Sequence, residues 1–262
     1  MRITNKKDKV LSSLEEWKQG FIEVDKKKHW REGYSAYSLG CFFTSGRGDM
    51  WLCAIEKAIL GHELNQSEGR IEHPSKLDQF RGGQRMQDLA IWGKTLFGQS
   101  CFIGIEAKVL EPFGDSTVYD AYLSGVEERE MRNPRSKKAE RVCQVIDFLF
   151  KGKKPKDGII KDLRYQLMHY FKASILEAPS LKESAFPLNE DRPKADIIIL
   201  PILVFKTSHY KGNLNLAKDN HDDYISFIHA LGCDKHNVDD LEFYHKVIDN
   251  RDVYTFYDVV DL

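Results

Sequence analysis

The chain has 262 residues, of which 42% are hydrophobic and 30% are charged, and its formal net charge is −1. This balance is typical of a soluble folded protein and excludes wholesale disorder, collagen-like fibres and coiled coils. No apolar run approaches the roughly 20 residues of a membrane helix, and the first ten residues lack the apolar core of a secretory signal. We therefore expect one large domain over 1–262, no contact with a membrane and, by default, a cytoplasmic location.

The charges are unevenly distributed along the chain. Residues 1–210 carry 34 basic and 29 acidic side chains, whereas residues 211–262 carry 5 and 11. Basic side chains gather between 129 and 156, where they either contact phosphates or form a solvated helix face and loop. The five cysteines are scattered without a CxxC pair, so we expect buried thiols and not a zinc knuckle or a disulfide framework.

Hydrophobic periodicity predicts the elements of the fold. In chain order they are a helix (9–22), a helix (50–62), a hairpin of two strands (86–92 and 101–110), three helices (115–130, 138–150 and 161–177), a buried strand (196–205) and a helix (221–231). Asp49 is the expected N-cap of the second helix, and Arg81-Gly82-Gly83 is typical of a turn. Residues 1–30 form a helical extension, and the acidic C-terminal tail, 233–262, is compatible with strand or helix. This order predicts an α/β fold with a mixed central β-sheet flanked by helices.

The hairpin carries the side chains that point to chemistry. Glu106 and Lys108 lie two residues apart in a predicted strand with apolar neighbours, so both leave the same face of the sheet. A charged pair inside an apolar strand is costly unless something binds it. If Asp88 of the neighbouring strand meets Glu106, the two carboxylates form a hard oxygen site suited to Mg²⁺ or Mn²⁺. A metal beside a lysine is suited to phosphodiester hydrolysis.

These residues resemble a known signature. Asp88 followed by Glu106-Ala107-Lys108 is similar to the PD-(D/E)XK nuclease motif, with Gln87 in place of the proline. Gln166-Leu-Met-His-Tyr170 resembles the Q-x-x-x-Y motif of the exonuclease-like branch. Further pieces resemble, in matching order, an uncharacterised bacterial family assigned to this superfamily: 28–36, Gly82-Gly83, 106–114, 163–169 and Ala195-Asp196.

The resemblance implies a restriction-endonuclease-like core and a metal-dependent nuclease that acts on DNA. It implies that Asp88 and Glu106 bind Mg²⁺ or Mn²⁺, with the carbonyl of Ala107 and Glu56 of the preceding helix as further ligands. Lys108 would hold the attacking water and stabilise the charge that develops on phosphorus. By analogy with the superfamily, a homodimer or a partner from a defence system is expected.

Other residues have assignments that the sequence leaves open. Gln166 and Tyr170 would orient Lys108 or a substrate phosphate, although Tyr170 is equally compatible with the core. Glu56 is also compatible with a surface position on its helix. Glu111 either binds the metal from the end of the strand or accepts a backbone hydrogen bond before Pro112. The candidates for contacts with the DNA backbone are Arg135, Lys137, Lys138 and Arg141.

A different class of function is also compatible with the sequence. A non-catalytic binding or regulatory protein could keep the fold and retain Glu106 and Lys108 as a structural ion pair. The near-neutral charge and the acidic C-terminal segment favour this alternative, because a nuclease that grips duplex DNA usually shows a stronger basic stripe. A nuclease requires Asp88, Glu106 and Lys108 to converge at an open cleft, whereas a binding protein can bury them.

Overall fold

The structure, a computed structural model, describes residues 1–25, 30–80, 84–109, 111–189, 191–207 and 214–262. The Gly82-Gly83 turn and residues 28–29 of the N-terminal motif lie outside the described residues. The elements in chain order are β1 (Arg2–Thr4), α1 (Leu14–Asp25), α2 (Ser35–Thr44), α3 (Arg47–Leu60), β2 (Asn65–Ser75), β3 (Arg85–Lys94), β4 (Ser100–Lys108), α4 (Val118–Met131), α5 (Lys138–Phe150), the 3₁₀ helix η1 (Gly158–Asp162), α6 (Tyr165–Ile175), α7 (Leu181–Ser184), β5 (Ile197–Lys206), α9 (Leu214–Leu231), β6 (Asp234–Val238), β7 (Leu241–Ile248) and β8 (Arg251–Asp261).

The strands of the described residues form one mixed sheet of eight strands in the order β1-β2-β3-β4-β5-β8-β7-β6. The predicted hairpin is confirmed, because β3 and β4 pair antiparallel on either side of a short turn. β4, β5 and β8 run parallel to one another at the centre of the sheet. Every residue of β5 but the last is buried, as expected for a parallel strand covered on both faces. The predicted α/β class with a mixed sheet flanked by helices is therefore correct.

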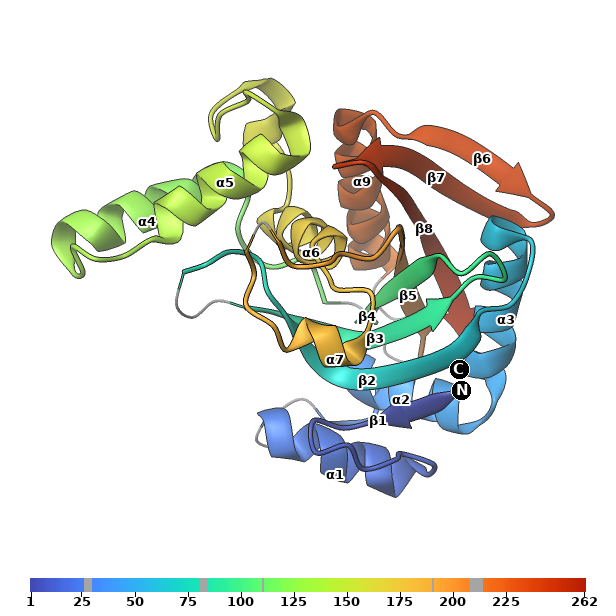
Figure 1. Cartoon of the computed structure of the whole chain (residues 1–262). Coiled ribbons are helices and arrows are strands. Elements are labelled where there is room, and N and C mark those ends of the chain that lie inside the picture. The colour runs from blue at the N-terminus through green and yellow to red at the C-terminus, as the bar shows by residue number, and fades with distance from the viewer. Residues whose placement is uncertain (26–29, 81–83, 110, 190, 208–213) are drawn as a thin grey trace.

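Helices cover both faces of the sheet (Figure 1). On one face, Phe42 of α2 packs on Phe205 of β5, and Trp51 of α3 packs on Phe256 of β8. On the other face, α6 and α9 contact the sheet, and Tyr224 of α9 lies 3.2 Å from the hydroxyl of Thr255. Successive residues of a strand point alternately to the two faces of the sheet. Glu106 and Lys108 stand at positions of β4 that point to the face contacted by α6.

The helices α4 and α5 form a hairpin that projects from the body of the molecule (Figure 1). Thr117 caps α4 by accepting from the backbone of Asp120, whose carboxylate bonds back to the Thr117 backbone, a capping box. Gly125 lies where the two helices approach each other closely, since a Cβ there would come within 2.5 Å of the Ala139 nitrogen. One end of the α4–α5 hairpin is attached to the rest of the fold, and the loop that connects the two helices is exposed to solvent.

Four local predictions were wrong, the first being that of buried thiols, because Cys101 alone of the five cysteines is buried. Asp49 does not cap the second helix, because α3 begins earlier, after Gly46 in the left-handed region at φ 79°, which glycine adopts without strain. The segment 233–262 is not a tail: it supplies β6, β7 and β8, and β8 is inserted beside β5. Residues 1–30 are not wholly helical, because β1 pairs parallel with β2 at the edge of the sheet.

The search for membrane-crossing helices gave a negative result. Among the residues that the structure describes, every helix is too short or too polar to traverse a bilayer.

Candidate active site

The candidate site lies where β3 and β4 separate. Their antiparallel pairing runs from the hairpin turn to Leu89 and Ile105. One residue further, the ladder gives way to a side-chain contact, in which Asp88 Oδ2 accepts a hydrogen bond of 2.7 Å from the backbone nitrogen of Ala107. The carboxylate of Asp88 is thereby held beside the segment that carries Glu106 and Lys108.

Glu106 is the centre of the site. Its side chain is only 2% exposed, and Arg85 at the start of β3 forms an ion pair with its Oε2. Lys108 Nζ lies 3.0 Å from its Oε1, and Gln166 Nε2 of α6 donates to the same oxygen at 2.9 Å. Two cations and one amide therefore surround a single buried carboxylate, which satisfies its charge and fixes its orientation.

Burial and mutual repulsion set the protonation of the two carboxylates. Burial, followed by the negative charge of Glu106, raises the pKa of Asp88 to about 7. Burial opposes ionisation of Glu106 as well, but the charges and hydrogen bonds of Arg85 and Lys108 outweigh it and hold the pKa of Glu106 below its usual range. Glu106 is the permanent anion of the pair, and Asp88 is the member whose charge responds to an additional cation.

Lys108 is enclosed by the chain that follows β4. Its ammonium lies 5.6 Å from the centre of the ring of Phe113, a residue that is fully buried. Glu111 turns back to accept hydrogen bonds from the backbone nitrogens of Val109, at 2.7 Å, and Ser35, at 3.2 Å. Of the two assignments left open for Glu111, the structure shows the backbone acceptor.

Gln166 and Tyr170 face the sheet from one side of α6, as their spacing predicts, but with different roles. Gln166 contacts Glu106 and not Lys108. The hydroxyl of Tyr170 donates to the carbonyl oxygen of Gly104 and lies 3.3 Å from that of Pro201. Tyr170 is fully buried, so it ties α6 to β4 and β5. The prediction that Tyr170 orients Lys108 or a phosphate is not supported by these contacts.

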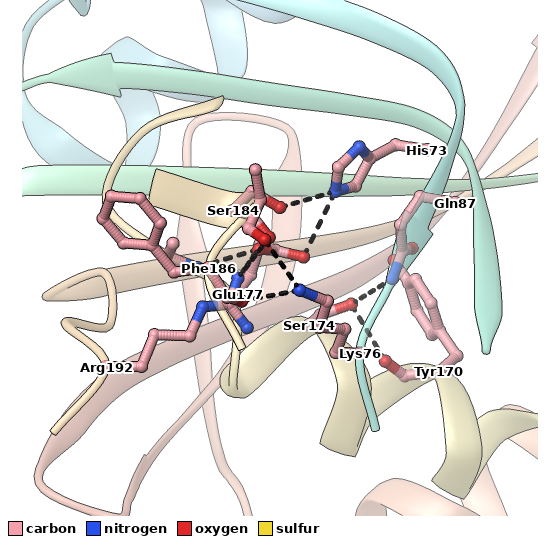
Figure 2. Close-up of polar contacts among 11 residues, drawn as sticks. His73, Lys76, Gln87, Tyr170, Ser174, Glu177, Ser184, Phe186 and Arg192 are labelled. Atoms are coloured by element: carbon pink, nitrogen blue, oxygen red, sulfur yellow. Dashed lines mark hydrogen bonds and ion pairs between the residues drawn. The ribbon is translucent and has the colours of Figure 1, made fainter. Parts of the chain in front are cut away.

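A short chain of hydrogen bonds extends this anchoring (Figure 2). Ser174 Oγ donates to the carbonyl oxygen of Tyr170 and accepts from Nε2 of Gln87, each at 2.9 Å. Gln87 stands at the position where the nuclease motif that this sequence resembles has proline. Its amide joins the strand of Asp88 to α6, a contact that proline does not make.

We expect Tyr170→Phe to lower the stability of the protein. The variant removes the donor for a buried carbonyl oxygen, which costs about 1–3 kcal/mol of unfolding free energy. Urea denaturation measures this loss, and Tyr224→Phe, which removes a comparable buried hydroxyl from α9, is the matched control. Unchanged stability of Tyr170→Phe beside a loss in Tyr224→Phe would contradict the structural role.

Glu56 is not brought to the site. Its buried carboxylate accepts a hydrogen bond of 2.9 Å from the Leu64 nitrogen, and burial raises its pKa. The same charge acts on Cys101, which lies at the opposite end of β4 from Glu106. The expectation that Glu56 is a metal ligand is therefore wrong in geometry: Glu56 fastens the end of α3 to the start of β2.

The four predicted DNA contacts differ in their surroundings. Arg135 is exposed in the loop of the α4–α5 hairpin, and Lys138 donates to Ser124 of α4 at 2.9 Å. Lys137 and Arg141 lie over the ring of Phe80, at 5.9 and 5.8 Å from its centre. Arg141 also forms an ion pair with Asp78, so its charge is partly compensated within the protein.

Arg85 is the member of this charged cluster that the sequence pattern does not predict. No sequence motif marks this arginine. The net charge of the motif does indicate a missing cation, because Asp88, Glu106 and Lys108 together carry one uncompensated negative charge. Burial, followed by the positive charges of Arg85 and Arg141, lowers the pKa of His169 of α6 to about 4, which favours the neutral imidazole.

Comparison with known proteins gives one match. Residues 10–258 match the family model described as "Domain of unknown function (DUF6946)". The chain belongs to the DUF6946 family. No curated protein and no solved structure matches it.

This DUF6946 chain offers few side chains that could bind a metal ion at the candidate site. Among its described residues, no three side chains of histidine, cysteine, aspartate or glutamate gather as a metal-binding group. Asp88 and Glu106 remain as a pair, with the backbone of Ala107 between them and the lysine. A pair of carboxylates plus a carbonyl is still a hard oxygen set of the kind that Mg²⁺ takes, since Mg²⁺ keeps several waters.

Proposed function

We propose that this chain is a metal-dependent phosphodiester hydrolase that acts on DNA, built on a restriction-endonuclease-like core. The observation that carries the proposal is the convergence of Asp88, Glu106 and Lys108 at the point where β3 and β4 separate. The order of elements around them, a hairpin followed by a helix and a parallel strand, supports the resemblance to PD-(D/E)XK nucleases.

The residues present fit a divalent cation. Burial, followed by the negative charge of Glu106, raises the pKa of Asp88 to about 7, and a divalent cation beside the two carboxylates would favour the ionised form of Asp88. Asp88, Glu106 and the carbonyl of Ala107 would hold Mg²⁺ or Mn²⁺, and Arg85 would have to release Oε2 of Glu106. A bound metal of this kind polarises a phosphoryl oxygen and lowers the pKa of its water.

The protein groups around the carboxylates would act on the phosphate. Lys108 Nζ, held by Glu106, is placed to orient the attacking water and to stabilise negative charge on the phosphoryl oxygens. Arg85, once released, supplies a bidentate donor suited to a phosphate. Gln166 keeps Glu106 in position and so acts as a positioning residue.

A cleavage assay with a lysine variant tests this function. Supercoiled plasmid and circular single-stranded DNA are incubated with Mg²⁺, Mn²⁺ or EDTA. We expect metal-dependent cleavage by the wild type and a rate reduced by about 10²–10³ in Lys108→Met, as is typical when one charge-stabilising donor is removed. Lys246→Met is the control, because Lys246 bonds to the carbonyl of Leu231 on α9. Equal rates in both variants would refute the assignment of Lys108.

One observation favours a non-catalytic binding protein instead. Glu106 is 2% exposed and Lys108 is 7% exposed, and Arg85, Lys108 and Gln166 already saturate the carboxylate. This arrangement is also that of a buried structural ion-pair cluster. Absence of both cleavage and divalent-cation binding by calorimetry would select this alternative.

A further inference from the structure

A pocket with apolar and polar lining lies at the chain between β2 and β3, where Phe80 precedes Arg85 of the candidate active site by five residues. It has a volume of about 380 Å³ and is formed by the chain after β2, by α5, by the end of α6 and by the connection between α7 and β5. Its apolar lining comes from Phe80, Leu176 and Leu188. The volume is in the range of ligand pockets, which exceeds what ordered water alone requires.

The polar lining of the pocket consists mainly of amides. They are Gln79, Gln144 and Asn189. All three residues are exposed, and none of the three side-chain amides bonds to another group in the part of the chain that the structure describes. Each amide offers one acceptor and two donors. The pocket therefore presents unpaired amide groups around a floor of aromatic and aliphatic side chains.

The charged groups at the pocket are already paired. Asp78 is bound by Arg141, and Lys194 Nζ lies 3.1 Å from Asp249. A ligand carrying a formal charge would therefore find no counter-charge inside the pocket. A neutral, planar group with donors and acceptors on its edge matches the lining, since asparagine and glutamine pair with base edges and aromatic rings stack on bases.

Basic side chains lie at the pocket as well as at the candidate site. Lys137 and Arg141 lie over Phe80, and Phe80 precedes Arg85, the partner of Glu106, by five residues. A charged backbone whose base enters the pocket would therefore pass near these cations.

We propose that this pocket holds an unpaired nucleobase of a single-stranded DNA segment, with Phe80 as the stacking surface and Gln79, Gln144 and Asn189 reading the base edge. The inference rests on the proposed function, because it names single-stranded or frayed DNA as the substrate of that site. A base inside a duplex is stacked on both faces and paired along one edge, so it enters such a pocket only after it is extruded, which costs free energy that a single strand does not require.

Binding measurements with an inactive protein test the proposal. Fluorescein-labelled 12-nucleotide oligo(dT) is titrated with Glu106→Gln protein in EDTA, with fluorescence anisotropy as the readout. Stacking of one base corresponds to a change in Kd of about tenfold. We expect this loss on adding Phe80→Leu, and a loss of severalfold on adding Gln144→Leu. The affinity for a blunt 12-base-pair duplex should change by less than twofold in both.

Two exposed residues of the β3–β4 turn provide matched controls. Phe97 is 83% exposed and Gln99 is exposed as well, so Phe97→Leu and Gln99→Leu make the same chemical changes away from the pocket. We expect both to leave oligo(dT) binding unchanged. Gln144→Leu also guards against misfolding of Phe80→Leu, because Gln144 is a solvent-exposed position on α5.

The outcomes separate this inference from the proposed function. Undetectable oligo(dT) binding, or equal binding by the pocket variants and their controls, would overturn the pocket even if the wild type cleaves plasmid DNA. Binding that depends on Phe80 and Gln144 supports the pocket. If the wild type then cleaves no DNA, the hydrolase assignment fails while the pocket stands.

Discussion

Glu106→Gln should abolish metal-dependent DNA cleavage. The variant keeps the size of the side chain and removes the charge that Arg85 and Lys108 share. A metal contributes several kcal/mol to phosphoryl transfer, and about 4 kcal/mol corresponds to a factor of about a thousand in rate. We therefore expect a loss of about a thousandfold or more, measured as initial rates on plasmid DNA in Mg²⁺.

The control for this variant is a second buried glutamate. Glu56→Gln makes the same change at the other end of β4, where the carboxylate serves the Leu64 backbone. We expect its cleavage rate to stay within about twofold of the wild type after correction for the folded fraction measured by circular dichroism. A rate in Glu106→Gln equal to that in Glu56→Gln would exclude Glu106 from catalysis.

Glu177→Ala should cause the largest loss of stability. Glu177 is 1% exposed, and its carboxylate binds Arg192 at 2.7 Å and lies 3.4 Å from Nε2 of His73 (Figure 2). Arg192 is itself buried, so the variant leaves a buried charge without its partner, which costs about 3–5 kcal/mol. Urea denaturation at neutral pH measures the loss.

The surface pair Lys57–Glu63 is the control for the Glu177 variant. Its two side chains are 58% and 56% exposed, and exposed pairs contribute about 0–1 kcal/mol, so Glu63→Ala should change stability little. The double variant Glu177→Leu/Arg192→Met should recover much of the lost stability, because a buried ion pair is often replaceable by apolar groups. Equal losses in Glu177→Ala and Glu63→Ala would contradict the structural role of this pair.

The carboxylate of Glu177 also makes the stability of the fold depend on pH. Burial opposes its ionisation, but the hydrogen bond and charge of His73, with the charge of Arg192, lower the pKa of Glu177 from 4.5 to about 2. Because the folded pKa lies below the unfolded one, this stabilisation is complete above about pH 4.5 and disappears as the pH falls through about 2. We expect the stability gap between the wild type and Glu177→Gln to be smaller at pH 3 than at pH 7.

The parts of the site that depend on local pattern were predictable. Alternation placed Glu106 and Lys108 on one face of a strand, and a short polar turn predicted its antiparallel partner with Asp88. Helical spacing placed Gln166 and Tyr170 on one face of α6. In each case the residues concerned are only a few positions apart in the sequence, and hydrophobic periodicity is informative over such short separations.

The parts that depend on distant partners were not predictable. Arg85 acquires its role from Glu106 across the separated strands, and no periodicity marks such a pair. Glu56 looked equivalent to a metal-binding acid until its hydrogen bond to Leu64 placed it at the other end of β4. The sequence of β8 is compatible with strand or helix because both faces of this strand are partly covered. Its parallel partner β5 lies far away in the sequence.

The strand register also orders the assembly of the molecule in time. In the β3–β4 hairpin Lys94 pairs with Ser100, whereas β4 meets β5 through Cys101 and Ile197. Closing the longer loop costs more chain entropy, and non-local pairing slows folding. We therefore expect the hairpin that carries Asp88 and Glu106 to form early in refolding, and the parallel pairing of β4 with β5 to form later.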